Sequence, residues 1–533
     1  MKITRRQFVA SSSAALLSAR PLGGQAAPPA AAMDALAAAI PLAASDPDRP
    51  IYHFRPPANW NNDPNGTIFY RGWHHLFYQL NPSAPRGGNQ HWGHARSRDL
   101  VNWEHLPIAL WPLTDRGERA IFSGGAIPGP DKRPKIFYTS IGHPSPEQWI
   151  ALPQDDDLLR WDRPASNPVI AIGIHGTTDV AQWRDPFLFV EGGQTYMVLG
   201  GNLNNGRGGG GCVLLYRATT SDLTKWSYLG VIFRYRDLRI YNVECPNLFR
   251  LGDKWVLLMS PQQPCEYFIG QLDLTRYQFV PETHGILDAG TSYASNISVD
   301  DRGRTIQWLW GRTNTPPEKG WNGCMTLPRL LSIGNDGFLR QLPPGEFESL
   351  RGAAISEPGF DLTPGEPVVL RRVQGDALEL RAEVVVGGAA DVAFDLRRST
   401  EGKAGVTVRI SRTGLLTVGT AQIQVSRALE RYSLRIFLDK RVVEVYINDG
   451  EAAVFGTVDA GADHIGVAIT AQAATGRGVG RGTVPPGGGA PGRGGAPATA
   501  GGRAGTANAN ARVESLTAWP MKAAQFSLEH FHL

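Results

Sequence analysis

Cysteine is scarce in this 533-residue sequence, and the four residues present are far apart. The count excludes a small scaffold held together by disulfides, and the spacing contains neither a CxxC pair nor a Cys/His pattern typical of zinc sites. An even number would permit two disulfides in an oxidising compartment, but we expect free, buried thiols. We expect no metal site. The four residues are Cys212, Cys245, Cys265 and Cys324.

An excess of charge of one sign and long apolar runs are also lacking. The chain has 53 basic and 49 acidic residues, which gives a formal net charge of +4. Lys2, Arg5, Arg6 and Arg20 lie in a segment that we expect to be removed, so the remaining chain is close to neutral. Such a balance predicts no nucleic-acid partner and no attraction to an anionic membrane. No later segment reaches the length of a transmembrane helix.

The first residues have the layout of an export signal. A basic start is followed by an apolar stretch and then by small residues, and the pair Arg5-Arg6 followed by Gln7-Phe8 resembles a twin-arginine signal. We therefore interpret residues 1–30 as a signal peptide of a bacterial protein that is periplasmic or secreted. An uncleaved amphipathic anchor is the alternative.

Between residues 48 and 342 the sequence repeats short strand-like runs that are separated by Gly, Pro, Asn and Asp. Helical periodicity is scarce, which favours an all-β fold of regularly spaced hairpins. Nearly 300 residues of small repeated sheets exceed what one sandwich needs and indicate a β-propeller. The units "RDLVNW", "DDLLRW" and "SDLTKW" each place a Trp four residues after an Asp, and we expect each Trp to anchor an outer turn.

A second all-β domain follows a linker at residues 343–354. Residues 355–525 show apolar residues at every second position in runs separated by short turns, which predicts a β-sandwich. Within it, residues 475–511 consist almost entirely of Gly, Ala, Pro, Arg, Thr and Asn. That segment cannot bury enough apolar surface to offset its ordering entropy, so we expect a disordered insert. Its arginines leave polyanion binding as a less favoured alternative.

Three acids stand out because each is followed closely by proline and an apolar strand. Asp63 lies in "NNDPNG", Asp185 in "QWRDPFLF" and Glu244 in "NVECPNLF". If these strands line the propeller axis, the three carboxylates, one from each of three sheets, project into the same central cavity. Glycoside cleavage needs one ionised carboxylate and one protonated carboxyl group at the same bond. A calcium site is the competing interpretation, but the short alternating spacing of acids that it requires is absent.

The surroundings of each acid suggest its protonation state. Asparagine amides around Asp63 can donate to its carboxylate and favour the charged form. Glu244 lies between apolar neighbours and faces two like charges, so we expect it to retain a proton. Arg184 would compensate the charge of Asp185, which would stabilise positive charge on the sugar. The amide donors expected at Asp63 are Asn59, Asn61, Asn62 and Asn65.

Several motifs occur in the order seen in glycoside hydrolase family 32, the invertase, inulinase and levanase family. They are "WNNDPNG", "FYQLNP", "WGHARSRDLVNW", "FSGG", "WRDPFLF" and "VECPNLF", and "LRIFLDKRVVEVYINDG" resembles the signature of that family's C-terminal sandwich. The resemblance spans about residues 50–523. It implies a five-bladed β-propeller followed by a C-terminal β-sandwich. It also implies cleavage of β-fructofuranosidic bonds with retention and without a cofactor.

The resemblance also implies site residues. Asp63 matches the nucleophile, Glu244 the acid/base and Asp185 the transition-state stabiliser. The positions that match substrate contacts are Asn62, Gln79, Phe122, Ser123, Arg184, Trp60 and Trp310.

Four positions depart from the family pattern. Asn61 stands where methionine is common and is expected to make the rim of the site more polar. Gly87 stands near a usual tryptophan, so an apolar wall is missing or supplied from elsewhere. Gly125 replaces a common serine, and Ser292 replaces an aspartate in a shortened motif. These changes leave the identity of the furanoside open.

Three functions are therefore compatible with the sequence. The first is a fructosidase that acts on sucrose, fructooligosaccharides, inulin or levan, or on another furanoside. The second is a fructosyltransferase that uses the same covalent intermediate. The third is a non-catalytic carbohydrate-binding propeller, which is disfavoured because all three acids are present.

Overall fold

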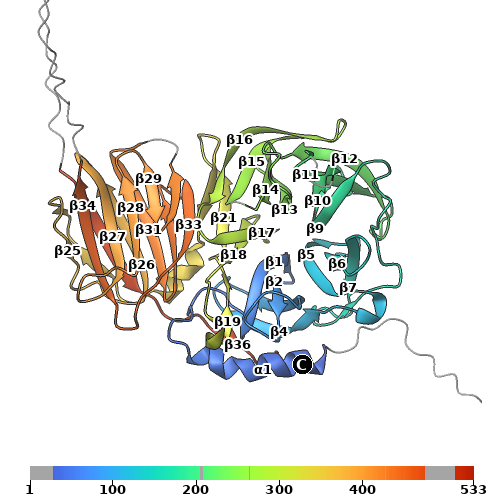
Figure 1. The fold of residues 1–533 in the computed structure, drawn as a ribbon, viewed down its shortest axis with the longest axis horizontal. Helices are drawn as coiled ribbons and strands as arrows, with labels where there is room; N and C mark the ends of the chain where they lie inside the picture. Colours follow the sequence, from blue (N-terminus) through green and yellow to red (C-terminus); the bar gives the residue numbers. More distant parts are fainter. Residues whose placement is uncertain (1–27, 205–207, 263, 426–427, 475–509, 533) are drawn as a thin grey trace, which may run out of the picture.

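The computed structural model describes residues 28–204, 208–262, 264–425, 428–474 and 510–532, and it is built mainly of strands (Figure 1). Five sheets follow one another along the chain and stand around a common centre, and two further sheets form a sandwich beside them. The expected all-β fold, a propeller followed by a sandwich, is confirmed. The segments expected to be a signal peptide (1–30) and a disordered insert (475–511) fall almost wholly outside the described residues.

The propeller sheets each consist mainly of consecutive antiparallel strands. Their strands are β1 (Asn59–Tyr70), β2 (Trp73–Asn81), β3 (His91–Ser97), β4 (Trp103–Leu110); β5 (Ala120–Pro128), β6 (Pro134–Ile141), β7 (Glu147–Pro153), β8 (Trp161–Asp162); β9 (Val180–Glu191), β10 (Gln194–Leu203), β11 (Gly211–Ala218), β12 (Trp226–Arg234); β13 (Glu244–Leu251), β14 (Lys254–Ser260), β15 (Cys265–Asp273), β16 (Gln278–Asp288); and β17 (Ser292–Val299), β18 (Thr305–Gly311), β20 (Cys324–Met325), β21 (Arg329–Ile333), β22 (Leu339–Leu342). Short 3-10 turns lie at η1 (Thr114–Arg116), η3 (Pro317–Lys319) and η4 (Gly345–Leu350).

The innermost strands of the five sheets form a closed ring. Strand β1 contacts β5, β5 contacts β9, β9 contacts β13, β13 contacts β17, and β17 returns to β1. Residues on these strands therefore meet at one axis even though they are far apart in the sequence.

The repeated Asp-Leu-x-x-Trp unit forms the same turn in three sheets, before the fourth strand. The leucine adopts a left-handed backbone conformation, with φ between 59° and 65°. Its carbonyl oxygen accepts a hydrogen bond from the indole Nε1 of the tryptophan three residues later, at 2.9–3.3 Å. The indole thus satisfies a buried carbonyl and fixes the start of the outer strand, as expected. The pairs are Leu100 with Trp103, Leu158 with Trp161, and Leu223 with Trp226.

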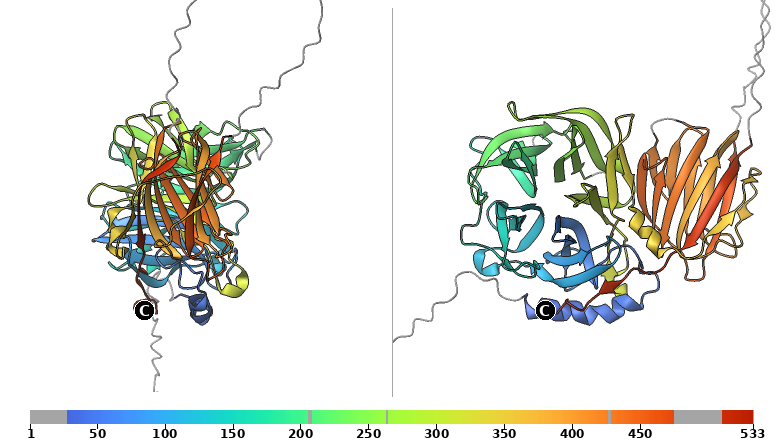
Figure 2. Two further views of the ribbon diagram at one scale, coloured as in Figure 1. Left: turned by 90° about the vertical axis from the view of Figure 1, so that its left-hand side faces the viewer. Right: turned by 180° about the vertical axis from the view of Figure 1, so that it is seen from behind.

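Two short strands from later in the chain complete the first sheet. Strand β19 (Trp321–Asn322) pairs in parallel with β1, and β36 (Phe526–Ser527) pairs in parallel with β4. Helix α1 (Ala30–Ser45) lies along the outside of this sheet (Figures 1 and 2). Asp46 after the helix accepts hydrogen bonds from Trp321 Nε1 and Lys319 Nζ at 2.7 and 2.9 Å. No helix among the described residues is long and apolar enough to cross a bilayer.

The sandwich buries aliphatic side chains between two antiparallel sheets. One sheet has the order β23-β35-β26-β31-β32-β33 with β24 also on β35, and the other has the order β25-β34-β27-β28-β29-β30. The strands are β23 (Ile355–Glu357), β24 (Phe360–Asp361), β25 (Val368–Val369), β26 (Ala377–Val385), β27 (Ala389–Arg398), β28 (Val406–Ser411), β29 (Leu415–Val418), β30 (Ala421–Gln424), β31 (Arg431–Asp439), β32 (Val442–Ile447), β33 (Ala452–Thr457), β34 (Gly466–Ala473) and β35 (Arg512–Pro520).

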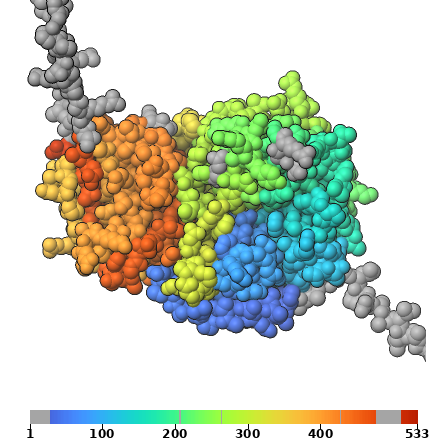
Figure 3. All heavy atoms as spheres, in the orientation of Figure 1, coloured from blue at the N-terminus to red at the C-terminus, as the bar shows by residue number. Residues whose placement is uncertain are grey.

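A fully buried ionic network joins the sandwich to the propeller, where the two lie directly against each other (Figure 3). Glu444 of the sandwich contacts Arg329 of the fifth propeller sheet at 2.9 Å and His53 at 3.1 Å. His53 also contacts Asp439 at 2.9 Å, and Arg329 contacts Asp288 at 2.7 Å. Since all five side chains have no exposure to solvent, each charge depends on its partners. The domain contact is therefore specified by charge as well as by shape.

This network predicts a pH window for stability. Although burial alone would lower it, hydrogen bonds to Asp439 and Glu444 raise the pKa of His53 from 6.5 to about 9. Its contribution is therefore complete below pH 6.5 and is lost as the pH rises through 9. We expect the difference in melting temperature between the wild type and His53→Gln to be constant from pH 5 to about 6.5 and to shrink toward pH 9 and above. A difference that grows with pH, measured by calorimetry, would contradict the assignment.

Candidate active site

Each innermost strand carries an irregularity at the position that faces the axis. The pairing register shifts in β1 after Asn61, in β5 after Ile121, in β9 after Arg184, in β13 after Glu244 and in β17 after Tyr293. In the first four strands, two residues lie opposite a single residue of the next strand. Such bulges re-aim side chains and are frequent near active sites. The same kind of register irregularity therefore directs side chains from all five sheets toward the propeller axis.

Proline and left-handed residues explain why the strands bulge at these places. Pro186 and Pro246 lie in two of the bulges and Pro64 directly follows a third, and none of them can donate to the ladder. Asp185 and Cys245, the residues before two of these prolines, have φ values of 62° and 46°. The residue pattern that singled out the three acids therefore has a structural cause.

A cavity of about 190 Å³ opens at these bulges. Nine of the ten residues predicted from the sequence line it, and Trp60 lies behind them. Sequence reasoning missed four lining residues, Gln90, Cys245, Tyr293 and Arg312, although Tyr293 belongs to the shortened motif that contains Ser292. The nine predicted residues are Asn62, Asp63, Gln79, Phe122, Ser123, Arg184, Asp185, Glu244 and Trp310.

Asp63 accepts hydrogen bonds on both oxygens. Ser123 Oγ donates to Oδ2, and Asn62 Nδ2 donates to Oδ1 at 3.0 Å. Gln79 Nε2 in turn donates to Ser123 Oγ at 3.1 Å. Burial raises the pKa of Asp63 above its ordinary value, against the lowering effect of the bonds from Ser123 and Asn62. These bonds fix the orientation of the carboxylate and stabilise its charged form.

The expected ring of four asparagine donors around Asp63 is wrong. Of these four asparagines, only Asn62 donates to Asp63. Asn59 donates to Pro82 O at 2.6 Å, and Asn65 accepts from Gly124 N. Asn61 is fully buried rather than on the rim, because the strand turns its side chain away from the axis. Ser123, from the next sheet, takes the role that the sequence assigned to local amides.

Cys245 lies between two of the acids. Its backbone N–H donates to Asp185 Oδ2 at 3.0 Å, and its Sγ lies 3.6 Å from Asp185 Oδ2 and 3.6 Å from Asp63 Oδ2. The two carboxylates therefore flank one sulfur atom. All four cysteines are free and buried, as expected. Asp185 is held further by its own backbone N–H, which donates to Thr139 Oγ1 at 3.0 Å.

Glu244 is paired differently from the expectation. Arg184 Nη2 donates to Glu244 Oε1 at 2.6 Å, whereas Arg184 Nε is 4.0 Å from Asp185 Oδ2. Tyr293 OH donates to the other oxygen of Glu244 at 2.5 Å. The expected apolar setting of Glu244 is wrong. Arg184 does compensate the charge of Asp185, as expected, but it donates its hydrogen bond to Glu244. The left-handed backbone at Asp185 turns neighbouring side chains apart, so Arg184 reaches the next sheet.

Aromatic rings close one side of the cavity. Trp60 and Trp310 meet edge to face with ring centroids 5.3 Å apart, and Trp60 Nε1 donates to Asn62 Oδ1 at 2.8 Å. A Cβ on Gly87 would lie 3.9 Å from the Trp60 ring, so this glycine borders the same wall. Trp310 and Phe122 therefore supply the apolar surface that Gly87 lacks.

Gly125 and Ser292 have distinct surroundings. A Cβ on Gly125 would lie 2.9 Å from Pro186 O, so a serine there would require a backbone shift where β5 meets β9. Ser292 is buried and its hydroxyl has no hydrogen-bond partner among the described residues. Nor do the described residues contain a group of three or more His, Cys, Asp or Glu side chains that could hold a metal ion.

Asp185 should make the protein less stable at neutral pH than at acidic pH. Burial raises its pKa from 3.8 to about 7, against the effect of Arg184 and with the help of the Glu244 and Asp63 charges. The native state therefore binds a proton that the unfolded state releases between about pH 4 and 7, and stability falls across that window. We expect Asp185→Asn to melt higher than the wild type above pH 7 and at the same temperature near pH 4. Equal melting temperatures at both pH values would contradict the shift.

Comparisons with known proteins agree with the motifs. The family model "Glycosyl hydrolases family 32 N-terminal domain" matches residues 53–343, and "Glycosyl hydrolases family 32 C terminal" matches residues 346–477. A levanase of Bacillus subtilis is 30% identical over 462 residues, which are 76% of this chain and 65% of the levanase. A fructan 1-exohydrolase of Triticum urartu is 33% identical over 369 residues, 62% of this chain and 60% of that protein. The chain thus spans less than two thirds of the length of either relative.

Solved structures show the same architecture. Fructan 1-exohydrolase IIa of Cichorium intybus superposes with a TM-score of 0.76 at 23% identity, over 91% of this chain and 99% of that one. A β-fructofuranosidase of Bombyx mori gives a TM-score of 0.70 at 25% identity, over 93% of this chain and 98% of that one. With both of its domains matched by the family models and with the motifs gathered at one cavity, the chain belongs to glycosyl hydrolase family 32.

Proposed function

We propose that the protein is a retaining glycosidase that cleaves β-fructofuranosidic bonds in sucrose, fructooligosaccharides or fructans such as inulin and levan. The observation that carries this proposal is the arrival of Asp63, Asp185 and Glu244, from three different sheets, in one cavity. Two carboxyl groups that act on one bond are the common requirement of glycosidases. The names of the relatives, which include levanase and fructan exohydrolase, support a fructoside as substrate.

In the proposed first step, Asp63 attacks the anomeric carbon. An ester bond forms to the fructosyl group as the glycosidic C–O bond breaks, and Glu244 gives its proton to the leaving oxygen. In the second step Glu244 takes a proton from water, the water oxygen bonds to the anomeric carbon, and the ester breaks to release Asp63. Ser123 and Asn62 hold the Asp63 carboxylate in one orientation, so less conformational entropy is lost when it reaches the geometry for attack.

Arg184 and Asp185 have supporting roles in this mechanism. Asp185 lies beside Asp63 across Cys245, where a carboxylate stabilises the positive charge that develops on the sugar ring. Arg184 donates a hydrogen bond to Glu244 in the structure described here. When substrate binds, Arg184 would donate to a sugar hydroxyl instead. Once released, Glu244 is free to take up the proton that it donates.

The test is a substrate panel with analysis of products. The purified protein is incubated with sucrose, 1-kestose, inulin, levan and aryl furanosides, and the released sugars are identified by chromatography. We expect fructose, and in the presence of methanol we expect methyl β-fructofuranoside, whose configuration reports retention. Longer oligosaccharides at high substrate concentration would indicate the transferase. Release of only a non-fructose furanose, or the α-methyl product, would contradict the proposal.

We further propose that the protein is exported to the periplasm or secreted. The basic start, the paired Arg5-Arg6 and the apolar stretch that follows support this assignment. Fusion of residues 1–30 to a reporter that is active only after export tests it, with Arg5→Lys plus Arg6→Lys as the control. A reporter that stays inactive with the native segment would contradict the proposal.

A further inference from the structure

A second polar cavity lies on the sandwich, apart from the active site. It has a volume of about 380 Å³, within the range of about 300–1,000 Å³ that is usual for small-ligand sites. Its floor is the outward face of strands β35, β26, β31 and β32, and its edge includes Leu342 at the end of the propeller and Gly450 after β32. Tyr446 donates to Glu444 of the interdomain network, but the other polar groups that face this cavity belong neither to that network nor to the proposed mechanism.

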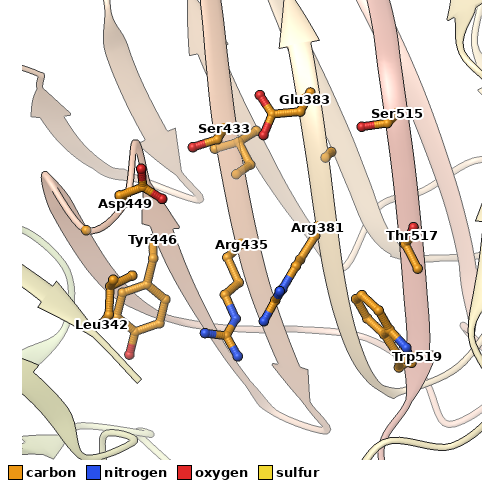
Figure 4. Close-up of a pocket in the computed structure, with 13 residues that line it drawn as sticks. Leu342, Arg381, Glu383, Ser433, Arg435, Tyr446, Asp449, Ser515, Thr517 and Trp519 are labelled. Carbon is orange, nitrogen blue, oxygen red and sulfur yellow. The ribbon is translucent and has the colours of Figure 1, made fainter. Parts of the chain in front are cut away.

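The strand register arranges these groups in two rows. The first row runs Thr517, Arg381, Arg435, Tyr446 across the four strands, and the second runs Ser515, Glu383, Ser433 across three of them. Residues directly opposite one another on neighbouring strands project from the same face. Figure 4 shows the two guanidinium groups lying side by side between Tyr446 and Trp519. A continuous strip of donors and acceptors therefore covers the floor.

One donor in this strip is buried without a partner. Arg435 Nε donates to the buried carboxylate of Glu379 at 2.8 Å, but its Nη2 has no hydrogen-bond partner among the described residues and is shielded from solvent. Buried donors are nearly always satisfied, so this unpaired guanidinium nitrogen beside the cavity needs an explanation, and a polar group bound in the cavity would supply one. The Glu383 carboxylate and the Ser433 and Ser515 hydroxyls likewise make no side-chain hydrogen bond to another described residue.

The balance of charge identifies the kind of ligand. Arg381 and Arg435 are offset by Glu383 and Asp449, so the lining carries no net charge. Arg381 and Arg435 are already paired with Glu379. An apolar ligand, however, would bury the carboxylates of Glu383 and Asp449 without hydrogen bonds, and a polyanion would be repelled by both of them. Trp519 adds an aromatic edge, and Arg351 holds it with Cζ 4.3 Å from the ring centroid. Alternating donors and acceptors beside an aromatic ring fit a neutral polyhydroxylated chain.

We infer that this cavity is a second carbohydrate-binding site, which holds a neutral polysaccharide chain while the propeller acts on it. The identity of that chain as a fructan rests on the function proposed above. The site raises the local concentration of polymer at the enzyme without taking part in bond cleavage. Short substrates, which cannot reach both sites, gain nothing from it.

The test measures binding separately from cleavage. The full chain carrying Asp63→Asn is run in native gels that contain inulin, levan or another neutral polysaccharide, with alginate as the polyanion. Ser433→Tyr and Ser515→Tyr place a ring in the cavity, and Thr417→Tyr on β29 of the other sheet is the matched control. We expect retardation by a neutral polymer, a loss of affinity of about tenfold or more in the two cavity variants, and none in the control. Melting temperatures identify any variant that has not folded. If one of the two cavity variants fails to fold, the affinity of the other one tests the inference.

In the otherwise wild-type chain, the same cavity variants should raise KM for the polymer and leave kcat/KM for sucrose unchanged. Retardation by alginate alone, equal retardation of all variants, or no retardation by any neutral polymer would overturn the inference. Failure of the proposed function is a separate result. A protein that cleaves no fructoside but is retarded by a neutral polymer through this cavity would retain the site and lose the fructan assignment.

Discussion

Asp63→Asn is expected to lower kcat/KM for a fructoside by a factor of at least about 10⁴, because the amide cannot form the covalent ester. The fold should not suffer. Burial raises the pKa of Asp63, so the native state tolerates a neutral group there better than a charge. Asparagine also keeps the shape and can still bond to Ser123 and Asn62. Initial rates on sucrose or inulin and a melting curve at neutral pH check both parts.

Glu244→Gln supplies the matched control for this result. It should also slow cleavage of natural substrates, but an aryl fructoside with a good leaving group needs little help from an acid in the first step. Hydrolysis of that substrate by Glu244→Gln should therefore be limited by the second step and should be accelerated by added azide. Asp63→Asn should show no such rescue. Rescue of Asp63→Asn and not of Glu244→Gln would exchange the two roles.

Glu444→Gln is expected to cost about 3–5 kcal/mol of folding free energy, the usual effect of breaking a buried ionic network. Glu444 is contacted by Arg329, by His53 and by the backbone N–H of Leu327 at 2.6 Å, and Tyr446 OH donates to it at 2.6 Å. Although burial would raise it, Arg329 and His53 lower the pKa of Glu444 to about 2. Its stabilising effect is therefore present above pH 4.5 and is lost as the pH falls through 2.

Urea denaturation near pH 6 measures this loss. Glu514→Gln is the control, because Glu514 pairs with Arg431 on the exposed surface of the same domain and its loss should not shift the transition measurably. Because the chain has two domains, each transition is followed by tryptophan fluorescence and by circular dichroism to detect separate unfolding. Equal midpoints for Glu444→Gln and the wild type would show that the domain contact does not depend on this charge.

The fold class and most of the cavity could be predicted from the sequence because both have local signals. Period-2 apolar runs specify strands, and the proline after Asp63 or Asp185 marks a bulge that faces the axis. The recurring Asp-Leu-x-x-Trp unit specifies one turn within six residues. In each case the information lies within a short segment of chain.

Pairings between sheets had no such signal. Arg184 is adjacent to Asp185 in sequence yet bonds to Glu244, because its direction depends on the left-handed backbone at the bulge. Ser123 reaches Asp63 from the neighbouring sheet, and Gln90 and Arg312 join the cavity from loops and strand ends without a motif. Helix α1 was not predicted because its alanine-rich sequence shows no clear apolar stripe.

The parallel pairing of β36 with β4 bears on how the chain is made. A ribosome releases Trp103 and Glu104 more than 400 residues before it releases Phe526 and Ser527, which pair with them at the edge of the sheet. Until then, the backbone groups of β4 at this edge have no partner strand, and unpaired strand edges can associate with another chain. The edge of the first blade is therefore completed only after residue 527 has emerged.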